Sequence, residues 1–325
     1  MPLLAVDNLH VHFRTPFGNV YAIRGIDFEV GKGEILGVVG ETGCGKSVTG
    51  RSITRLLPGN GQITQGRILF EGQDLLTLSE TDMHSIRGKR IAMIFQDPAT
   101  VLNPVFTIGQ QVVNVIMAHQ SGSRKAAREN TIELLHSVGL PDPQHLVNVY
   151  PHQLSGGQQQ RVMIAMCLAG EPDLIIADEP TTALDVTIQA QILDLLRQLQ
   201  EERDISVILI THDLGVIAET CHKVVVLYAG RVAEYGPVEA IFSDPKHPYT
   251  QGLMAALPKP GSRGSELKII SGNVPSGREP LPGCAFAPRC EFVLEHCQHQ
   301  PPDYFQFAMG HQVSCFLHEG ESVDV

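Results

Sequence analysis

The sequence GETGCGKS at residues 40–47 decides the fold of this chain. It matches the pattern G-x-x-x-x-G-K-[ST], in which the backbone N–H groups of a glycine-rich loop surround phosphate groups. The pattern requires a strand before it and a helix after it. The sequence at residues 34–39 is typical of a short buried strand, and a helix is expected from about Lys46. The sequence therefore predicts a phosphate-binding loop inside an α/β domain.

The loop residues have distinct expected roles toward ATP and Mg²⁺. Lys46 can reach the β- and γ-phosphates, and the Ser47 hydroxyl can ligate Mg²⁺. The N-terminus of the following helix adds a dipole that favours anions. The residues expected to contact the nucleotide here are Gly40, Glu41, Thr42, Gly43, Cys44, Gly45, Lys46, Ser47 and Val48.

Strands alternate with helices along the rest of the chain. Residues 4–30 alternate apolar and polar side chains around a turn at residues 15–19, which predicts antiparallel strands. Helical periodicity at residues 108–139 predicts a helical insertion between two halves of the sheet. Further strands are expected at 66–75, 91–95, 174–177 and 206–210, and further helices at 158–169 and 187–203. This order predicts a mostly parallel sheet covered on both faces.

Composition and charge exclude some functions. The chain has 325 residues, a net charge of -11 and a pI of about 5.7. No basic stripe is present, so nucleic acid is an unsuitable partner. The first residues lack a secretory signal, and the longest apolar runs are far shorter than a bilayer span. We therefore expect a soluble, cytoplasmic protein that reaches a membrane only through partners.

Two acids follow the apolar residues 174–177. Asp178 is placed to hold Mg²⁺, usually through water, and Glu179 is placed to polarise the attacking water. Two acids alone are equally typical of a solvated strand end. In a chain that also has a phosphate-binding loop, they predict the hydrolytic part of the same site.

The sequence LSGGQ at residues 154–158 provides a second anion site, because two glycines open a helix. A capped helix start is the alternative interpretation. The pentapeptide resembles the signature of the ABC ATPase superfamily. The resemblance implies a head-to-tail dimer in which this segment contacts the γ-phosphate held by the partner's loop. The residues it assigns are Ser155, Gly156, Gly157 and Gln158.

Three further positions match this family in order. Gln96 in IFQDP resembles the glutamine that contacts Mg²⁺ and water, Asp185 in ALD the dimer-interface aspartate, and His212 in ITHD the switch histidine that contacts the γ-phosphate. The implied catalytic residues are thus Lys46, Gln96, Glu179 and His212, and the implied Mg²⁺ ligands are Ser47, Gln96 and Asp178. An aromatic side chain before the loop stacks on adenine in this family. Phe17 fits best by spacing, with Phe13 and Tyr21 as alternatives.

Longer segments narrow the resemblance to the ATPases of dipeptide and oligopeptide importers. These segments are AMIFQDP at 92–98, YPHQLSGG at 150–157, IADEPTTALDVTIQA at 176–190 and HPYT at 247–250. The dipeptide branch fits best, but nickel, glutathione and oligosaccharide importers belong to the same group. The implied partners are two transmembrane permease subunits, a second ATPase subunit and, indirectly, an extracytoplasmic substrate-binding protein. A non-identical paralogue is favoured as the second ATPase, and the implied location is the cytoplasmic face of the inner membrane.

The resemblance also implies a domain organisation. We expect an ABC nucleotide-binding domain over residues 1–257, with a mixed sheet core, an antiparallel β subdomain and a helical subdomain at about 100–170. Residues 258–325 form the expected C-terminal extension, and Gly and Pro at 258–282 indicate a linker.

Four of the seven cysteines lie in this extension, at Cys284, Cys290, Cys297 and Cys315. Their spacing is looser than the C-x₂₋₄-C pairs of structural zinc sites, and four cysteines can hold an iron–sulfur cluster. The resemblance implies a [4Fe–4S] cluster. Zinc and free structural thiols are the alternatives.

Two other classes of protein are weaker fits. ABC ATPases of DNA repair carry a long coiled coil, and those of translation fuse two cassettes, whereas this sequence has neither feature. A P-loop kinase would lack the LSGGQ segment. The sequence therefore favours a transport ATPase.

Overall fold

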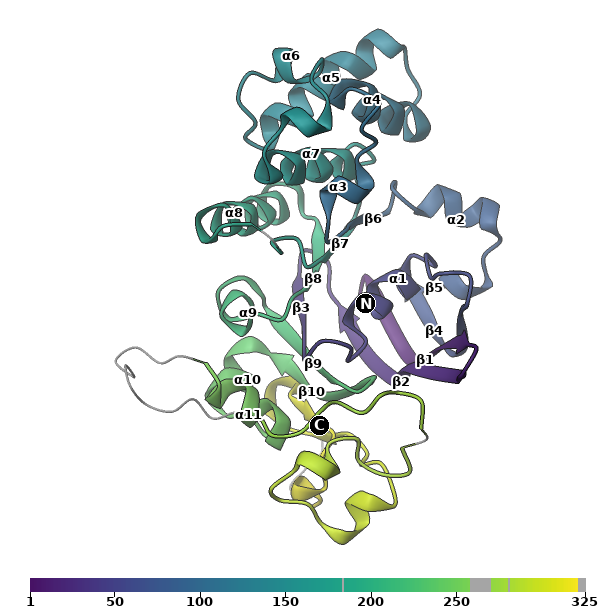
Figure 1. The fold of residues 1–325 in the computed structure, drawn as a ribbon, viewed down its shortest axis with the longest axis vertical. Coiled ribbons are helices and arrows are strands. Elements are labelled where there is room, and N and C mark those ends of the chain that lie inside the picture. Colours follow the sequence, from purple (N-terminus) through teal and green to yellow (C-terminus); the bar gives the residue numbers. More distant parts are fainter. Residues whose placement is uncertain (183, 258–269, 280, 321–325) are drawn as a thin grey trace. The chain divides into compact units, whose positions relative to one another are not determined.

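The computed structural model describes residues 1–182, 184–257, 270–279 and 281–320. Most of the predicted linker at 258–282 lies outside these residues, and the boundary after residue 257 stays a prediction. The chain forms two compact units (Figure 1). The first contains Met1–Gly31, Ile35–Leu76 and the chain from Thr211 onward, and the second contains Lys32–Glu34 and Thr77–Ile210.

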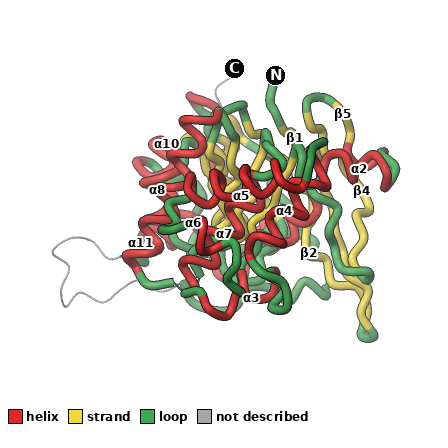
Figure 2. Tube along the Cα trace, turned by 90° about the horizontal axis from the view of Figure 1, so that it is seen from above, coloured by secondary structure: helices red, strands yellow, loops and turns green. Residues whose placement is uncertain are grey.

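The first unit begins with an antiparallel sheet. Its strands are β1 (Leu4–Thr15), β2 (Gly18–Val30), β4 (Gly61–Phe70) and β5 (Gln73–Asp74), in the order β2-β1-β4-β5. Thr15 pairs with Gly18, so the predicted turn and the antiparallel pairing are confirmed. Figure 2 shows these strands in yellow. Strand β1 pairs in antiparallel orientation with both β2 and β4.

A second set of strands in this unit carries the phosphate-binding loop. Strand β3 (Ile35–Val39) is buried at all five positions and pairs in parallel with β9 (Lys223–Tyr228). Next to β9, β10 (Arg231–Pro237) is antiparallel. Helices α1 (Lys46–Ile53), α9 (Leu214–Thr220), α10 (Val238–Ser243) and α11 (Pro248–Ala255) complete this part.

The second unit contains three parallel strands, β6 (Ile91–Ile94), β7 (Leu174–Asp178) and β8 (Ser206–Ile210). Every residue in them is buried, which explains why their sequences are apolar except at Asp178 and Ser206, the end of β7 and the start of β8. Helix α2 (Glu80–Ile86) precedes β6 in sequence, and α8 (Val186–Arg203) connects β7 to β8. The alternation of strands and helices predicted from the sequence is confirmed here.

The predicted helical insertion lies between β6 and β7. It consists of α3 (Pro98–Val101), α4 (Ile108–His119), α5 (Arg124–Ser137), α6 (Pro143–Leu146) and α7 (Gly156–Leu168). Helix α7 begins two residues earlier than the predicted start at residue 158. The reason is a capping box, in which Ser155 and Gln158 satisfy each other's backbone N–H groups and so permit Gly156 to be helical.

The C-terminal extension is part of the first unit's core. Ala285 and Phe286 are buried in a cluster with residues of β9, β10, α9 and α11. Short strands β11 (Phe305–Gln306) and β12 (Gln312–Val313) extend the sheet from β10. Short 3₁₀ turns also occur in the described parts of both units, at Leu75–Thr77, Pro151–Gln153, Ala287–Arg289, Glu295–Gln298, Ala308–Gly310 and Phe316–His318.

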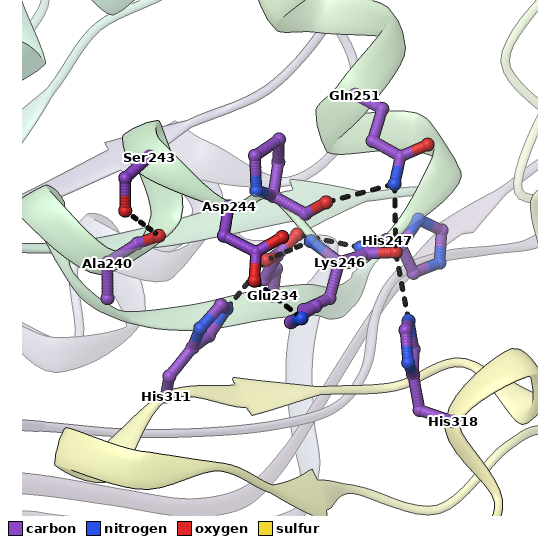
Figure 3. A network of polar contacts seen from close by, with 10 residues as sticks. Glu234, Ala240, Ser243, Asp244, Lys246, His247, Gln251, His311 and His318 are labelled. Carbon is purple, nitrogen blue, oxygen red and sulfur yellow. Dashed lines mark hydrogen bonds and ion pairs between the residues drawn. The ribbon is translucent and has the colours of Figure 1, made fainter. Parts of the chain in front are cut away.

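A fully buried carboxylate, that of Glu234 on β10, anchors the extension (Figure 3). It accepts hydrogen bonds from the backbone N–H groups of Lys246 and His247, at 2.8 and 3.0 Å. The His311 ring lies 2.6 Å from the same carboxylate. A buried charge needs such partners, so Glu234 ties both α11 and β12 to β10.

Across the described residues, no helix combines the length and the apolarity required to cross a bilayer.

Candidate functional site

The phosphate-binding loop connects β3 to α1, as predicted. Gly40, Gly43 and Gly45 have φ values of 154°, 83° and 112°, a region that L side chains rarely adopt. A Cβ atom on Gly40 would lie 2.2 Å from the Leu227 carbonyl oxygen, and one on Gly45 would lie 2.6 Å from Ile23 Cδ1. A Cβ on Gly43 would meet nothing within 4 Å. The loop therefore requires glycine at two closely packed positions and is open at Gly43.

Lys46 is held inside this loop. Its side chain is buried, and Nζ donates hydrogen bonds to the carbonyl oxygens of Gly40 at 2.7 Å and Glu41 at 3.2 Å. Helix α1 has Gly45 as its N-cap, without a side-chain cap. A helix start of this kind presents backbone N–H groups to an anion. The arrangement fits a polyphosphate, with the Lys46 cation poised at the loop.

His212 lies in the same unit as the loop. The Thr211 backbone N–H donates to the Val38 carbonyl oxygen at 3.1 Å, so the chain passes the carboxyl end of β3 just before His212. The loop leaves β3 at that same end. His212 is exposed and precedes α9, whose N-cap is Asp213. The structure thus brings two of the predicted catalytic segments to one strand end.

The candidate aromatic residues lie on the antiparallel sheet. Phe17 is 82% exposed in the β1–β2 turn, and the Arg278 guanidinium lies 5.9 Å from its ring centroid. Tyr21 is 40% exposed, with the Arg24 guanidinium 5.2 Å from its ring centroid. Phe13 is partly buried. The choice among them stays a prediction.

The second unit holds the predicted acids at the end of β7. Asp178 is buried, and Glu179 follows it with φ of 46°, a left-handed conformation that is unusual for a residue with a side chain. Such strain persists where the surroundings enforce it, typically at functional sites. The Glu179 backbone N–H donates to the Ile210 carbonyl oxygen at 2.9 Å, which fixes the conformation.

Two side chains hold the Glu179 carboxylate. The Gln96 side-chain amide donates to Glu179 Oε2 at 3.1 Å, and the Thr182 hydroxyl donates to the same oxygen at 2.9 Å. Strands β6 and β7 are parallel neighbours, so Gln96 and Glu179 follow adjacent carboxyl ends. Thr182 was not singled out from the sequence. Its position three residues after Glu179, within a turn, is the only local signal for this contact.

The LSGGQ segment and the ALD segment approach each other in this unit. Ser155 caps α7, and Asp185 caps α8 by accepting from the Ile188 N–H at 3.0 Å. A Cβ atom on Gly157 would lie 2.7 Å from Ile188 Cγ2, so glycine is needed where the two helix starts meet. Ala183 lies outside the described residues. Ser155 therefore caps α7 with its hydrogen bonds, as the alternative interpretation of this segment predicts. Capping of this kind is compatible with an anion site at the same helix start.

The donor types suit Mg²⁺. The predicted ligands offer a hydroxyl, a carboxylate and an amide oxygen, from Ser47, Asp178 and Gln96 respectively. Mg²⁺ prefers such oxygen ligands and retains several waters. No nitrogen or sulfur ligand is required in this set.

The predicted iron–sulfur cluster is wrong. Although the four tail cysteines line one small cavity, the described residues contain no group of three or more His, Cys, Asp or Glu side chains that could hold a metal ion. All seven cysteines are free. Burial raises the pKa of the Cys284 and Cys290 thiols, and that of Cys315 to about 11. Cys284, Cys290, Cys297 and Cys315 therefore do not form the expected [4Fe–4S] site, and the zinc alternative has no support either.

Comparisons with known proteins agree with this fold. Residues 23–182 match the family model described as ABC transporter, and residues 233–297 match that described as oligopeptide/dipeptide transporter, C-terminal region. The dipeptide transport ATP-binding protein DppD of Bacillus subtilis is 50% identical over 98% of this chain and 95% of its own. DppD of Escherichia coli is 46% identical over 97% of this chain and 96% of its own. The names of these relatives mention no metal cluster.

A solved structure supports the same conclusion. The dimeric ATP-binding cassette MJ0796, bound to ADP and Pi, matches with a TM-score of 0.65 and 29% identity, over 72% of this chain and 98% of that chain. The fold and the site thus define an ABC-type ATPase. The chain belongs to the ATP-binding subunits of ABC transporters, in the group that carries the oligopeptide/dipeptide transporter C-terminal region.

Proposed function

We propose that this chain hydrolyses ATP to energise the import of dipeptides or oligopeptides through partner permease subunits. The observation that carries the hydrolytic part is the Glu179 carboxylate, held by Gln96 and Thr182 directly after the buried Asp178. A carboxylate fixed in this way can polarise a water molecule for attack on a phosphate.

In the proposed reaction, Glu179 orients and polarises the attacking water, and Gln96 positions the Glu179 carboxylate. Lys46 stabilises the charge that develops on the phosphate oxygens, and His212 contacts the γ-phosphate. Ser47, Asp178 and Gln96 would hold a Mg²⁺ ion, which would supply further neutralisation of phosphate charge. Each residue thereby acts on the phosphate end of ATP.

We further propose that a second ATPase subunit, favoured to be a non-identical paralogue, completes the site. The segment from Ser155 to Gln158 would face the nucleotide of that subunit, with Asp185 at the interface. ATP then favours the closed pair because it contacts both subunits only in that state. Hydrolysis removes these contacts and allows the pair to open. Two permease subunits and an extracytoplasmic binding protein would use this cycle, which places the chain on the cytoplasmic face of the inner membrane.

The substrate class rests on the relatives. The two matching family models and the dipeptide and oligopeptide transport ATP-binding proteins at 46–50% identity support peptides. Nickel, glutathione and oligosaccharides are the alternatives, with the same role for the chain. Substrate contacts belong to the permeases and the binding protein, so the ATPase residues do not distinguish these cases.

The hydrolytic assignment is tested with Glu179→Gln in the assembled transporter. This variant keeps the shape of the side chain but loses the carboxylate, so turnover should fall by about 100-fold or more while ATP binding persists. Gln120→Ala is a control in the same unit, because Gln120 donates only to groups outside this site, Ala169 and Glu171. Near wild-type turnover of Glu179→Gln would remove Glu179 from the mechanism.

A further inference from the structure

An ion pair joins the C-terminal extension to the phosphate-binding loop. The Arg289 guanidinium donates to Glu41 Oε2 at 2.7 Å and to Glu41 Oε1 at 3.0 Å. The Arg289 side chain is 5% exposed, and that of Glu41 is 29% exposed. The two residues are 248 positions apart in sequence. Glu41 lies in the segment that matches the ABC transporter family model, and Arg289 lies in the segment that matches the oligopeptide/dipeptide transporter C-terminal region. Two parallel N–H···O bonds make this a geometrically specific contact.

Arg289 is itself fixed by its surroundings. It donates to the carbonyl oxygens of Ser271 at 2.8 Å and Ile270 at 3.1 Å, and to the Tyr228 hydroxyl at 3.2 Å. Its guanidinium also lies 5.6 Å from the Tyr228 ring centroid and 5.9 Å from that of Phe286. A side chain held at so many points presents its donors without further loss of rotamer freedom.

A second tether reaches the same loop residue through its backbone. The Glu41 N–H donates to the Tyr249 hydroxyl at 2.9 Å. Tyr249 belongs to the HPYT segment, is fully buried, and packs against Tyr228 and Phe286 with ring centroids 4.6 and 5.5 Å away. Through Tyr249, the HPYT segment therefore contacts both the loop residue Glu41 and Phe286 of the extension.

Glu41 connects Arg289 and Tyr249 to the rest of the phosphate-binding loop. Its carbonyl oxygen accepts hydrogen bonds from Lys46 Nζ and from the Cys44 N–H, both at 3.2 Å. The residue that the extension holds is therefore bonded directly to the phosphate-binding lysine. Neither Arg289 nor Tyr249 belongs to the loop or to the hydrolytic residues.

We propose that Arg289 and Tyr249 are positioning residues of the nucleotide site, through which the C-terminal extension sets the loop's affinity for nucleotide. Arg289 neutralises a carboxylate that stands inside a phosphate-binding loop, where an unpaired negative charge repels the polyphosphate. Tyr249 fixes the backbone of the same residue, so less conformational freedom is lost on binding. The inference rests on nucleotide binding by this loop and is independent of the transported substrate.

The experiment measures ADP binding to the purified full-length chain by calorimetry, because ADP occupies the loop without hydrolysis. Arg289→Ala should weaken ADP binding by about tenfold, the loss that corresponds to one charge-assisted contact. Adding Glu41→Gln to Arg289→Ala should recover much of this loss, since the unpaired charge is then gone. Tyr249→Phe, which removes one hydroxyl and keeps the ring, should weaken binding by a few-fold.

His318→Ala is the matched control. The His318 ring contacts the Lys246 carbonyl oxygen at 3.1 Å, so this change loosens the extension away from the loop. It should leave the ADP affinity within about twofold of wild type, an effect below one weak hydrogen bond. Thermal unfolding of each variant shows whether the fold is retained, and Arg289→Lys replaces Arg289→Ala if the latter does not fold.

Two results would overturn the proposal. One is an ADP affinity of Arg289→Ala equal to that of His318→Ala. The other is a double variant, Arg289→Ala with Glu41→Gln, that binds ADP no better than Arg289→Ala alone, because a purely structural role for Arg289 gives no charge rescue. Both results concern ADP binding to the purified chain, so they do not depend on whether the transporter takes up peptides.

Discussion

The side-chain amide of Gln96 donates a hydrogen bond to Glu179 Oε2 over 3.1 Å, between segments 83 residues apart in sequence. The contact arises because β6 and β7 are parallel neighbours whose carboxyl ends release both residues at one edge. Thr182 donates to the same oxygen. Both contacts fall on Oε2, so together they set the orientation of the Glu179 carboxylate.

Removal of the Gln96 contact should slow hydrolysis. We expect Gln96→Ala to lower the ATPase kcat of the assembled transporter by at least about tenfold, the equivalent of one hydrogen bond to a charged group. Gln96→Glu should lower it further, because two carboxylates would face each other. An unchanged kcat in Gln96→Ala would show that the contact does not position Glu179.

Ser155 separates helix capping from anion binding. Ser155→Ala removes the α7 N-cap and should cost about 1 kcal/mol in the free energy of unfolding. Ser155→Asp retains a capping oxygen but places a negative charge at the proposed anion site. Urea unfolding should rank Ser155→Asp above Ser155→Ala, and ATPase activity should rank them in the opposite order. If activity followed stability instead, this segment would act only as a helix start.

His247 should make stability fall in mild acid. Its ring is buried and its Nδ1 accepts the Tyr249 N–H, and burial lowers its pKa to about 4 from the ordinary value of 6.5. The charge of Glu234 opposes this shift, and that of His318 adds to it. The unfolded chain therefore binds a proton as the pH falls through 6.5, whereas the folded chain does so only near pH 4. The free energy of unfolding should decrease over this window, by up to about 1.4 kcal/mol per pH unit.

His247→Asn provides the comparison, because asparagine can cap α11 without titrating in this range. The pH dependence of its unfolding, measured with urea between pH 6.5 and pH 4, should be flatter than that of wild type. Parallel curves for the two proteins would exclude His247 as a source of the acid sensitivity.

The sequence predicted the strands and helices because their patterns are local. The five apolar residues of β3, for example, indicate a buried strand without any knowledge of their neighbours. The loop at 40–47 and the acids at Asp178 and Glu179 can be predicted from sequence because their chemistry requires fixed spacing. The start of α7 was misplaced by two residues, since the capping role of Ser155 outweighed the low helix propensity of two glycines.

Contacts between distant segments could not be predicted in the same way. Nothing near Arg289 in sequence indicates that its guanidinium meets Glu41, and nothing near Tyr249 indicates that its hydroxyl accepts the Glu41 N–H. The cysteines show the reverse error. Their spacing and a family resemblance predict a cluster, yet the part of the chain that the structure describes holds no group of three or more His, Cys, Asp or Glu side chains that could bind a metal ion. Spacing along the chain constrains ligand number but leaves ligand geometry undetermined.

ATP hydrolysis by this chain should drive peptide import. Its most direct test is uptake of a labelled dipeptide, with nickel as a parallel substrate, in source cells that carry wild type or Glu179→Gln. We expect Glu179→Gln to abolish dipeptide uptake and to leave nickel uptake unchanged. Dipeptide uptake at the wild-type rate in cells that carry only Glu179→Gln would contradict it.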